Sequence, residues 1–373
     1  MPGVRPSPPT PPGGAGPDPV ILLAYDDRPP IGGQGTYLLG LEEHLPAAGV
    51  PVRVCSARRG PAGPRWQVPQ ITGRAPLDFS IWLRWRLPAV ARAWHPRAWH
   101  ALGGPGGVLL TAPPPGAPLV YSANHTYHTA HRGRWAARPL MALEARGYRA
   151  AEALIAISPS TAQSLVEDYG VRPDRIAVIP PGIDTGLFHP CPPGEPQAAT
   201  VLYVGRLARE KGVLAFLRLA EGLLQERPEA RVWICGDGPE RSRVRQLAAR
   251  WPGRVASPGR VDDETLADRL RRATVVVMPS AYEGLGLVAL EALASATPVV
   301  GHDVPGLRDL AAAGVVLARP GDPGLLARAV RELLDDPARR TALGMRGRQY
   351  VEQHHSWAQL SVAVAEVYRA VTP

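Results

Sequence analysis

Short β-branched runs alternate with helix-length segments twice along the chain, and this pattern constrains the fold more than any other feature. The runs in the first series are 20–25, 52–56, 118–124, 153–158 and 175–180, and those in the second are 201–205, 231–236, 275–280, 298–303 and 314–318. Strands that alternate with helices form parallel sheets covered on both faces. Because the Pro-rich segment 189–196 separates the two series, the sequence predicts two doubly wound α/β domains.

The expected boundaries follow from this pattern. We predict a first domain over 20–190 and a second over 191–355, with a helix at about 356–373 packing back on the first domain. The N-terminal stretch 1–19 is mostly Pro and Gly and has no apolar core segment, which predicts a disordered leader rather than a signal peptide. No run of about 18 apolar residues occurs, so the sequence predicts no membrane span.

Composition narrows the set of partners. The net charge of +9 favours anionic partners such as nucleotides, phosphorylated substrates or an acidic lipid surface. Three widely spaced cysteines, Cys55, Cys191 and Cys235, indicate neither a disulfide framework nor a zinc site and predict a cytoplasmic protein. Among many arginines Lys211 is the only lysine, and Asn124 is the only asparagine. Either Lys211 serves where a compact ammonium is needed, or it is a chance survivor on a solvated loop.

Two carboxylates in "YEGLGLVALE" (282–291) have an unusual setting. Glu291 lies in a segment that is apolar all round, so its carboxylate is expected to be buried and to need a partner. The two hydroxyls of a ribose could be that partner, while the amides after Gly284 and Gly286 form an anion site. Glu283 is placed to hold sugar hydroxyls. The alternative is two solvated glutamates around a helix cap.

Other polar residues follow the predicted strands at their carboxyl ends, where open α/β sheets bind ligands. Arg206 and Lys211 follow the strand 201–205 and can neutralise a diphosphate, although a plain basic loop is the alternative. The remaining residues at this edge are Gly32, Gly33, Asn124, His125 and Glu283. A lone histidine is more often structural, but the position of His125 after Asn124 favours a site. We therefore expect a cleft between the two domains.

These motifs resemble those of the retaining GT-B glycosyltransferases of family 4, whose two Rossmann-like domains face a cleft. The resemblance rests on "GRLAREKG", on "EGLGLVALE" followed by "TPVV", and on "IAISPSTAQSL", "IAVIPPGIDTGLF" and "GDGPE". They occur in order over most of 20–355, and together they are specific. The chain departs from the family pattern at Pro181, Leu285 and Ala296, where the family has Asn, often Phe, and Gly; none of these positions is charged.

The resemblance implies a role for each matched residue. Arg206 and Lys211 would contact the donor diphosphate, Glu283 the transferred sugar, Glu291 the ribose, and His125 would lie beside the sugar. We predict Arg206, Lys211, Glu283 and His125 as catalytic. The predicted donor-binding residues are Gly32, Gly33, Asn124, Gly205, Gly284, Leu285, Gly286, Leu287, Val288 and Glu291.

The implied activity is metal-independent transfer of a hexose, with retained configuration, from a UDP- or GDP-linked sugar to an acceptor hydroxyl. We predict no cofactor. We also predict no metal, because Asp26, Asp27, Asp262 and Asp263 form no Asp-x-Asp pattern, and Arg206 and Lys211 already supply the positive charge of a divalent ion. A nicotinamide dehydrogenase is disfavoured because no third glycine stands at Leu38. The alternatives left open are an epimerase-like enzyme of the same architecture and a sugar-nucleotide-binding protein without turnover. A nucleic-acid binder would explain the charge but not Glu291.

The stretch 78–100 is rich in Trp and Arg and could touch an anionic membrane peripherally. Its helical periodicity is poor and Pro88 interrupts it, so an ordinary helix against the first sheet is favoured. Further arginines could extend the basic patch or hold an anionic acceptor; they are Arg132, Arg134, Arg138, Arg146 and Arg149.

Overall fold

A computed structural model describes residues 18–28, 30, 32–57, 68–131, 133, 135–192 and 199–372. The chain divides into two compact units, each considered by itself below: unit 1 comprises Met1–Gly182 and Trp357–Pro373, and unit 2 comprises Ile183–Ser356. Residues 1–17 of the predicted leader and 193–196 of the Pro-rich segment lie outside the described residues.

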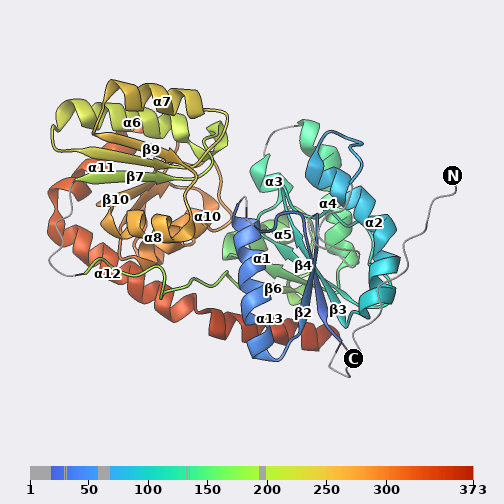
Figure 1. The fold of residues 1–373 in the computed structure, drawn as a ribbon. Coiled ribbons are helices and arrows are strands. Elements are labelled where there is room, and N and C mark those ends of the chain that lie inside the picture. Colours follow the sequence, from blue (N-terminus) through green and yellow to red (C-terminus); the bar gives the residue numbers. More distant parts are fainter. Residues whose placement is uncertain are drawn as a thin grey trace, which may run out of the picture. The chain divides into compact units, whose positions relative to one another are not determined.

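Unit 1 is built on a six-stranded parallel sheet in the order β2-β1-β3-β4-β5-β6 (Figure 1). The strands are β1 (Val20–Ala24), β2 (Val52–Ser56), β3 (Ala98–Gly103), β4 (Leu119–Ala123), β5 (Ala153–Ala156) and β6 (Ile176–Val178). The helices are α1 (Gly33–His44), α2 (Ala75–Trp94), α3 (Tyr127–Ala130), α4 (Arg138–Ala150), α5 (Pro159–Glu167) and α13 (Trp357–Val371).

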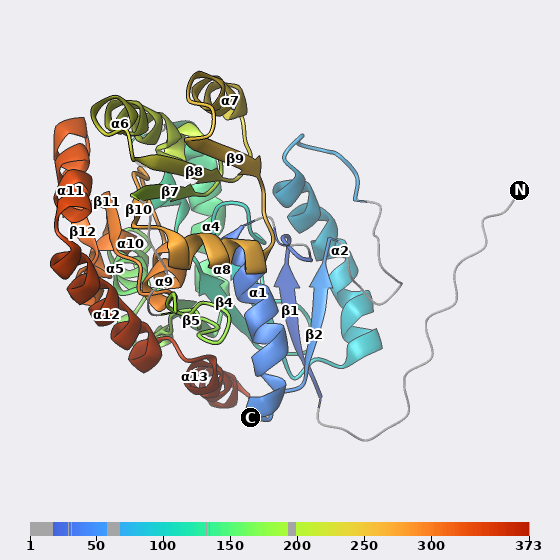
Figure 2. The same ribbon diagram turned by 60° about the vertical axis from the view of Figure 1, so that its left-hand side comes forward.

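The two faces of this sheet are covered by different helices. Alternate residues of β1, Ile21 and Leu23, join one buried cluster with Phe79 of α2, Tyr148 of α4 and Leu165 of α5. Helices α1 and α13 lie on the other face, as Figure 2 shows for α1 and α2 on either side of β1 and β2. Strands buried on both faces explain the continuous apolar runs in the sequence.

Strand β3, with the sequence "AWHALG", is missing from the sequence-based prediction, because its first three residues belong to the Trp/Arg stretch 78–100. It lies between β1 and β4 in the sheet. His100 fits there without exposure because its two ring nitrogens contact the Tyr368 hydroxyl and Ser122 Oγ, each at 2.6 Å. Burial lowers the pKa of His100 to about 3, so the neutral imidazole is a structural part of the core.

The Trp/Arg stretch forms helix α2, as the favoured interpretation predicted, and the helix continues through Pro88. Phe79, Leu83 and Val90 are fully buried against the sheet. Within the described part of the chain, no helix combines the length and apolar character needed to cross a membrane.

Unit 2 repeats the architecture with a sheet in the order β12-β11-β10-β7-β8-β9. Its strands are β7 (Thr200–Val204), β8 (Arg231–Cys235), β9 (Val255–Gly259), β10 (Val275–Met278), β11 (Val299–His302) and β12 (Val316–Ala318). Its helices are α6 (Val213–Glu226), α7 (Arg241–Arg250), α8 (Asp263–Arg272), α9 (Leu287–Ala294), α10 (Pro305–Arg308), α11 (Pro323–Asp335) and α12 (Pro337–His354). Strand β9, with the sequence "VASPG", was not predicted.

The boundary between the units lies earlier than predicted, between Gly182 and Ile183 rather than at 190/191. Residues after Gly182 belong to unit 2 because the Ile183 amide donates to the His355 carbonyl at 2.8 Å. Arg348 of α12 also donates to the Phe188 and Ala294 carbonyls, both at 2.7 Å. These bonds attach the segment to α12 and to the end of α9. The last helix, α13, is part of unit 1.

Candidate functional site

Lys211 and Glu283 form an ion pair at the carboxyl edge of the unit 2 sheet. Lys211 Nζ lies 2.8 Å from Glu283 Oε1, and Ser280 Oγ donates to the same oxygen at 2.7 Å. The Lys211 side chain is 31% exposed and that of Glu283 is 11% exposed. An ammonium has three donors, so Lys211 can hold Glu283 and still contact a second anion.

The turn that carries Lys211 is fixed by the hydroxyl of Tyr203 on β7. This hydroxyl contacts the Arg206 carbonyl at 2.9 Å and the Lys211 carbonyl at 3.2 Å. Gly212, which follows, has φ +71°, and a Cβ there would lie 1.8 Å from the Pro279 carbonyl oxygen. The turn therefore packs against the end of β10 only with glycine at this position.

Arg206 is more exposed than Lys211 and lies within the same turn. Its guanidinium is 65% exposed and lies 3.4 Å from Glu210 Oε1. The structure thus brings Arg206, Lys211 and Glu283 to neighbouring strand ends, β7 and β10, which are adjacent in the sheet. Two cations and one carboxylate at this edge can bind a diphosphate and a neutral polyol.

Glu291 is buried in α9, as its apolar surroundings predicted. The residue is 8% exposed, and among the described residues its Oε2 atom has no hydrogen-bond partner. Burial, with a smaller contribution from the charge of Asp263, raises the pKa of Glu291 to about 7. A buried acceptor without a partner is costly, so this oxygen is suited to a hydroxyl donated by a ligand.

Helix α9 begins at Leu287, directly after Gly286. The amides of Leu287 and Val288 precede the first hydrogen bond of the helix, which the Ala289 amide donates to the Gly286 carbonyl at 2.9 Å. The positive end of the helix dipole favours an anion there. Glu291 lies one turn further along, roughly 6 Å from Leu287 along the helix axis. The predicted residues Gly284 to Val288 and Glu291 are therefore one continuous element of the site.

In unit 1 the predicted residues also share one edge of the sheet. Gln34 Nε2, directly after Gly32 and Gly33, donates to the Gly103 carbonyl at the end of β3 at 2.8 Å. Gly104 has φ +95°, and a Cβ on it would lie 2.4 Å from the His125 carbonyl oxygen. The start of α1, the end of β3 and Asn124-His125 after β4 thus lie together.

Asn124 resembles Glu291 in one respect. It is 6% exposed, and its Oδ1 atom lacks a hydrogen-bond partner among the described residues. An amide oxygen buried at the sheet edge without a partner can accept from a ligand. The structure leaves the roles of Asn124 and His125 toward a donor as predictions.

Two family models match the chain. One, for the glycosyl transferases group 1, matches residues 193–350, and the other, for glycosyltransferase family 4, matches residues 31–187. The chain belongs to the GT-B glycosyltransferases of family 4. The matched regions fall on the two sheet domains. The predicted fold, two doubly wound domains with parallel sheets covered by helices, is confirmed, and each sheet has six strands.

Curated relatives support this assignment. The chain is 39% identical over 253 residues to a D-inositol 3-phosphate glycosyltransferase of Kineococcus radiotolerans, covering 59% of this chain and 57% of that one. It is 32% identical over 258 residues to an alpha-maltose-1-phosphate synthase of Mycolicibacterium smegmatis, covering 62% and 66%. The match thus spans about three fifths of the length of these relatives.

A solved structure shows the same fold. Sucrose-phosphate synthase from Thermosynechococcus elongatus superimposes with a TM-score of 0.77 at 22% identity, covering 95% of this chain and 98% of that one.

Three of the four aspartates considered as metal ligands have other contacts in this family 4 protein. Asp26 Oδ2 accepts from the Gly32 and Gly35 amides at 2.9 and 3.2 Å, and Asp27 Oδ2 accepts from Ser56 Oγ at 2.5 Å. Asp262 caps α8 by accepting from the Thr265 amide at 2.7 Å. Within the described ranges no three His, Cys, Asp or Glu side chains are grouped as metal ligands would be. The absence of a metal stays a prediction.

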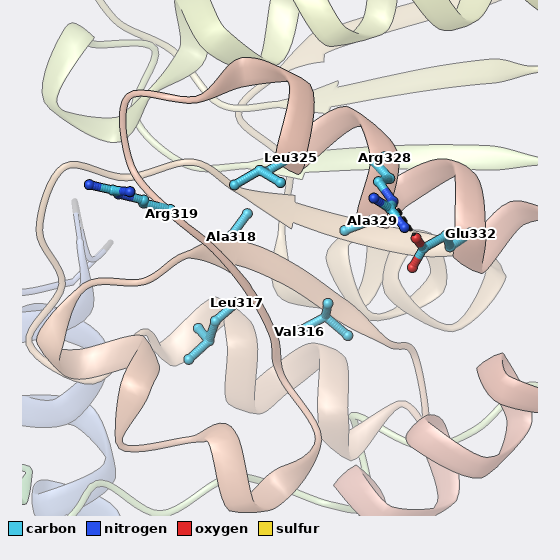
Figure 3. A pocket seen from close by; sticks show the side chains of 8 residues that line it. All are labelled: Val316, Leu317, Ala318, Arg319, Leu325, Arg328, Ala329 and Glu332. Atoms are coloured by element: carbon cyan, nitrogen blue, oxygen red, sulfur yellow. Dashed lines mark hydrogen bonds and ion pairs between the residues drawn. The ribbon is translucent and has the colours of Figure 1, made fainter.

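A cavity of about 220 Å³ lies elsewhere in unit 2, between β12 and α11 (Figure 3). Its lining is mainly apolar, with an ion pair between Arg328 and Glu332 at 2.8 Å on one side. The residues that line it are Val316, Leu317, Ala318, Arg319, Leu325, Arg328, Ala329 and Glu332. It contains none of the predicted donor-binding residues, so we do not assign it to the glycosyltransferase reaction.

Sequence reasoning missed the residues that support the site. Ser280 and Tyr203 hold Glu283 and the Lys211 turn, and the ring of Tyr282 lies 5.8 Å from Lys211 Nζ. Ser280 could have been found, since it ends the strand run 275–280. Tyr203 could not, because a buried strand tyrosine does not reveal which carbonyls its hydroxyl contacts.

Proposed function

We propose that the chain transfers a hexose from a nucleoside diphosphate sugar, linked to UDP or GDP, to an acceptor hydroxyl with retained configuration. The observation that carries the proposal is Glu291, a buried carboxyl whose Oε2 atom lacks a partner among the described residues. A ribose diol supplies the hydroxyls that this oxygen needs. Both curated relatives are named for the transfer or synthesis of sugar compounds, which supports an enzyme of this class.

Each charged residue has one task in the proposed reaction. Arg206 and Lys211 bind the diphosphate and stabilise the charge that it gains as its bond to the anomeric carbon breaks. The acceptor oxygen bonds to that carbon on the same face, and its proton passes to the leaving phosphate oxygen. Glu283 holds the hexose hydroxyls, and its pairing with Lys211 at 2.8 Å couples sugar and diphosphate positions. No metal and no cofactor enter these steps.

The unit 1 residues complete the proposal. Asn124 and His125 after β4, with Gly32 and Gly33 at the start of α1, are proposed to contact the donor sugar and phosphate. The acceptor is proposed to be a sugar, a lipid-linked molecule or a small molecule. We place the protein in the cytoplasm, with peripheral contact to an anionic membrane.

Separating nucleotide binding from transfer tests these assignments. Nucleoside diphosphate hexoses are first screened for thermal stabilisation of the chain, and transfer is then measured with and without a chelator. Glu283→Ala is expected to abolish transfer while the nucleotide still binds, because Glu283 is assigned to the hexose, and Arg206 and Lys211 remain to hold the diphosphate. Glu291→Ala is expected to weaken binding of the nucleotide itself. Glu366→Ala, at an exposed position of α13, is the matched control.

The outcomes distinguish the alternatives. Equal loss of binding and transfer in both variants would contradict the division of roles. Nucleotide binding with neither transfer nor donor hydrolysis would favour a binding protein without turnover. A product with inverted configuration by NMR would overturn the retaining mechanism, and loss of activity with the chelator would overturn metal independence.

A further inference from the structure

Residues 68–150 of unit 1 have a highly asymmetric charge. This segment contains ten arginines but only two acidic residues, Asp78 and Glu144. Both acids are buried, at 2% and 0% exposure. Asp78 accepts from the Thr72 amide at 2.6 Å, and Glu144 accepts from the Tyr127 amide at 2.9 Å. The surface that this segment contributes therefore carries arginines and no carboxylate of its own.

Two indole rings stand out on the same segment. Trp85 and Trp135 are each 80% exposed. Trp85 lies on the outer face of α2 between the exposed Arg84 and Arg86, and Arg92 is exposed two turns further on. The opposite face of α2 is buried against the sheet, so the position of Trp85 is not required by the core.

The second exposed tryptophan, Trp135, lies directly before helix α4. It opens the 3₁₀ turn Trp135–Ala137, which leads directly into α4, where Arg138, Arg146 and Arg149 are exposed. Arg132 and Arg134 precede it but lie outside the described residues. An exposed indole ring near exposed arginines therefore occurs both on α2 and in the turn that leads into α4.

Helices α2 and α4 border a common segment and lie on the same face of the unit 1 sheet. Ser80 Oγ of α2 accepts from the Leu109 amide at 3.0 Å, and Arg84 donates to Thr111 Oγ1 at 3.2 Å. A Cβ on Gly147 of α4 would lie 2.4 Å from the carbonyl oxygen of Leu110. Figure 1 shows the two helices in cyan and green. Their outer faces thus belong to one side of unit 1.

We propose that this Trp/Arg face, formed by Arg84, Trp85, Arg86, Arg92, Trp135 and Arg138, docks on the surface of an anionic lipid bilayer. Arginines near the surface are attracted by anionic headgroups. Indole rings insert at the boundary between headgroups and acyl chains. A nucleic acid duplex would match the charge but offers no apolar layer for two exposed indoles. The inference rests on the membrane contact proposed above, for which it names the surface in unit 1, and it does not depend on the proposed transfer.

The test uses the full chain and vesicles without any sugar donor. Co-sedimentation is measured with phosphatidylcholine vesicles, with and without phosphatidylglycerol, at low and high salt. We expect binding only to the anionic vesicles and its loss at high salt. Replacing Arg84 and Arg92 by Gln should weaken binding by about fivefold for each arginine. Trp85→Ala with Trp135→Ala should weaken it at least as much.

Matched controls separate this face from general positive charge. Arg218→Gln with Arg245→Gln removes two exposed arginines from α6 and α7 of unit 2, and binding should change less than twofold. All replaced residues are exposed, so the midpoint of thermal unfolding should stay constant. Equal loss in the control variant, equal binding to both kinds of vesicle, or retention by duplex DNA without vesicle binding would each overturn the proposal.

Discussion

Among the residues that the structure describes, unit 1 and unit 2 each bury one glutamate, and the two differ in how their oxygens are satisfied. Glu144 of α4 accepts hydrogen bonds from the Tyr127 amide and from the hydroxyls of Tyr148 and Tyr169. Glu291 of α9 has an oxygen without a partner among the described residues. Burial raises the pKa of both carboxyls to about 7. Both carboxyls are buried, but their different hydrogen-bond partners distinguish a structural carboxyl from one that can accept from a ligand.

The bonds to Glu144 explain its location. They fix the first turn of α3, and the Tyr169 hydroxyl in turn accepts from the His128 amide at 3.0 Å. This turn follows Asn124-His125 directly. Glu144 therefore supports the backbone next to the predicted site in unit 1, whereas Glu291 is itself a predicted contact.

Alanine substitutions should produce the largest contrast in stability. Glu144→Ala leaves the Tyr148 hydroxyl and the Tyr127 amide without an acceptor, so the free energy of unfolding should fall by about 3–5 kcal/mol. At a pH near 4.5, where the folded state keeps Glu291 neutral, Glu291→Ala removes a carboxyl that lacks a partner and should change it by less than about 1 kcal/mol. Urea denaturation measures both free energies of unfolding. Comparable losses in the two variants would contradict the distinction between Glu144 and Glu291.

The pH dependence of stability should be the next largest effect. The pKa of Glu291 is raised from 4.5 to about 7, so between these values the folded state binds more protons than the unfolded state. Unfolding free energy therefore falls as pH rises through this range, by roughly 3 kcal/mol in total at about 1.4 kcal/mol per pKa unit. Glu144 contributes in the same direction because its pKa is raised similarly.

Bound nucleotide should distinguish the two carboxyls. A diol that donates to Glu291 stabilises its ionised form, so the nucleotide should remove the contribution of Glu291 and leave that of Glu144. Glu291→Gln should flatten the same part of the profile without ligand. Thermal unfolding across this pH range measures both, and a profile that nucleotide leaves unchanged would count against an open Glu291.

Lys211→Arg should give a smaller effect. The compact ammonium lies 2.8 Å from Glu283 Oε1 and 5.8 Å from the centre of the Tyr282 ring. A planar guanidinium does not reproduce this placement, so turnover should fall about tenfold, or about 1.4 kcal/mol in barrier height. Arg209→Lys, at a 75% exposed neighbour, is the control and should keep full activity. Full turnover by the Lys211→Arg variant would contradict the claim that this site needs the compact ammonium of a lysine.

The smallest effect concerns strain just after α9. Ala296 has φ +54°, a region that costs a residue with a Cβ about 1–2 kcal/mol. Ala296→Gly relieves this cost but raises the conformational entropy of the unfolded chain. The free energy of unfolding should therefore rise by about 0.5–1 kcal/mol. Ala292→Gly, inside helix α9 (Leu287–Ala294), should instead lose about 1 kcal/mol. Ala296→Gly should leave nucleotide affinity unchanged. A changed affinity would show that the backbone strain at Ala296 affects nucleotide binding by Glu291.

The sequence predicted the fold where the strands are β-branched and continuous. It missed β3 because Trp99 and His100 of "AWHALG" are accommodated by partners distant in the chain, including Tyr368. It placed the domain boundary too late because Ile183 is held by His355 through a backbone bond. Such contacts depend on tertiary structure and leave no local pattern.

In the candidate site, too, features that depend on local sequence could be predicted, and those that depend on distant residues could not. The burial of Glu291 could be predicted from its helix, which is apolar on every side. The ion pair of Lys211 with Glu283 could not, because 72 residues separate the two in the chain. Nor could sequence distinguish Glu291 from Glu144, since the partners of Glu144 come from Tyr127, Tyr148 and Tyr169. Asn124 was found through its rarity, and the structure adds a buried oxygen without a described partner.

The central claim is that the two hydroxyls of a ribose donate hydrogen bonds to the carboxylate of Glu291. Isothermal titration of the chain and of Glu291→Ala with UDP and GDP, and with their 2′,3′-dideoxy analogues, tests it directly. For the nucleotide that binds, removal of the diol should weaken affinity for the unaltered chain by about tenfold or more. Its removal should change the affinity of the variant by less than twofold. An equal loss in both proteins would show that the diol and Glu291 do not interact, and would contradict the account.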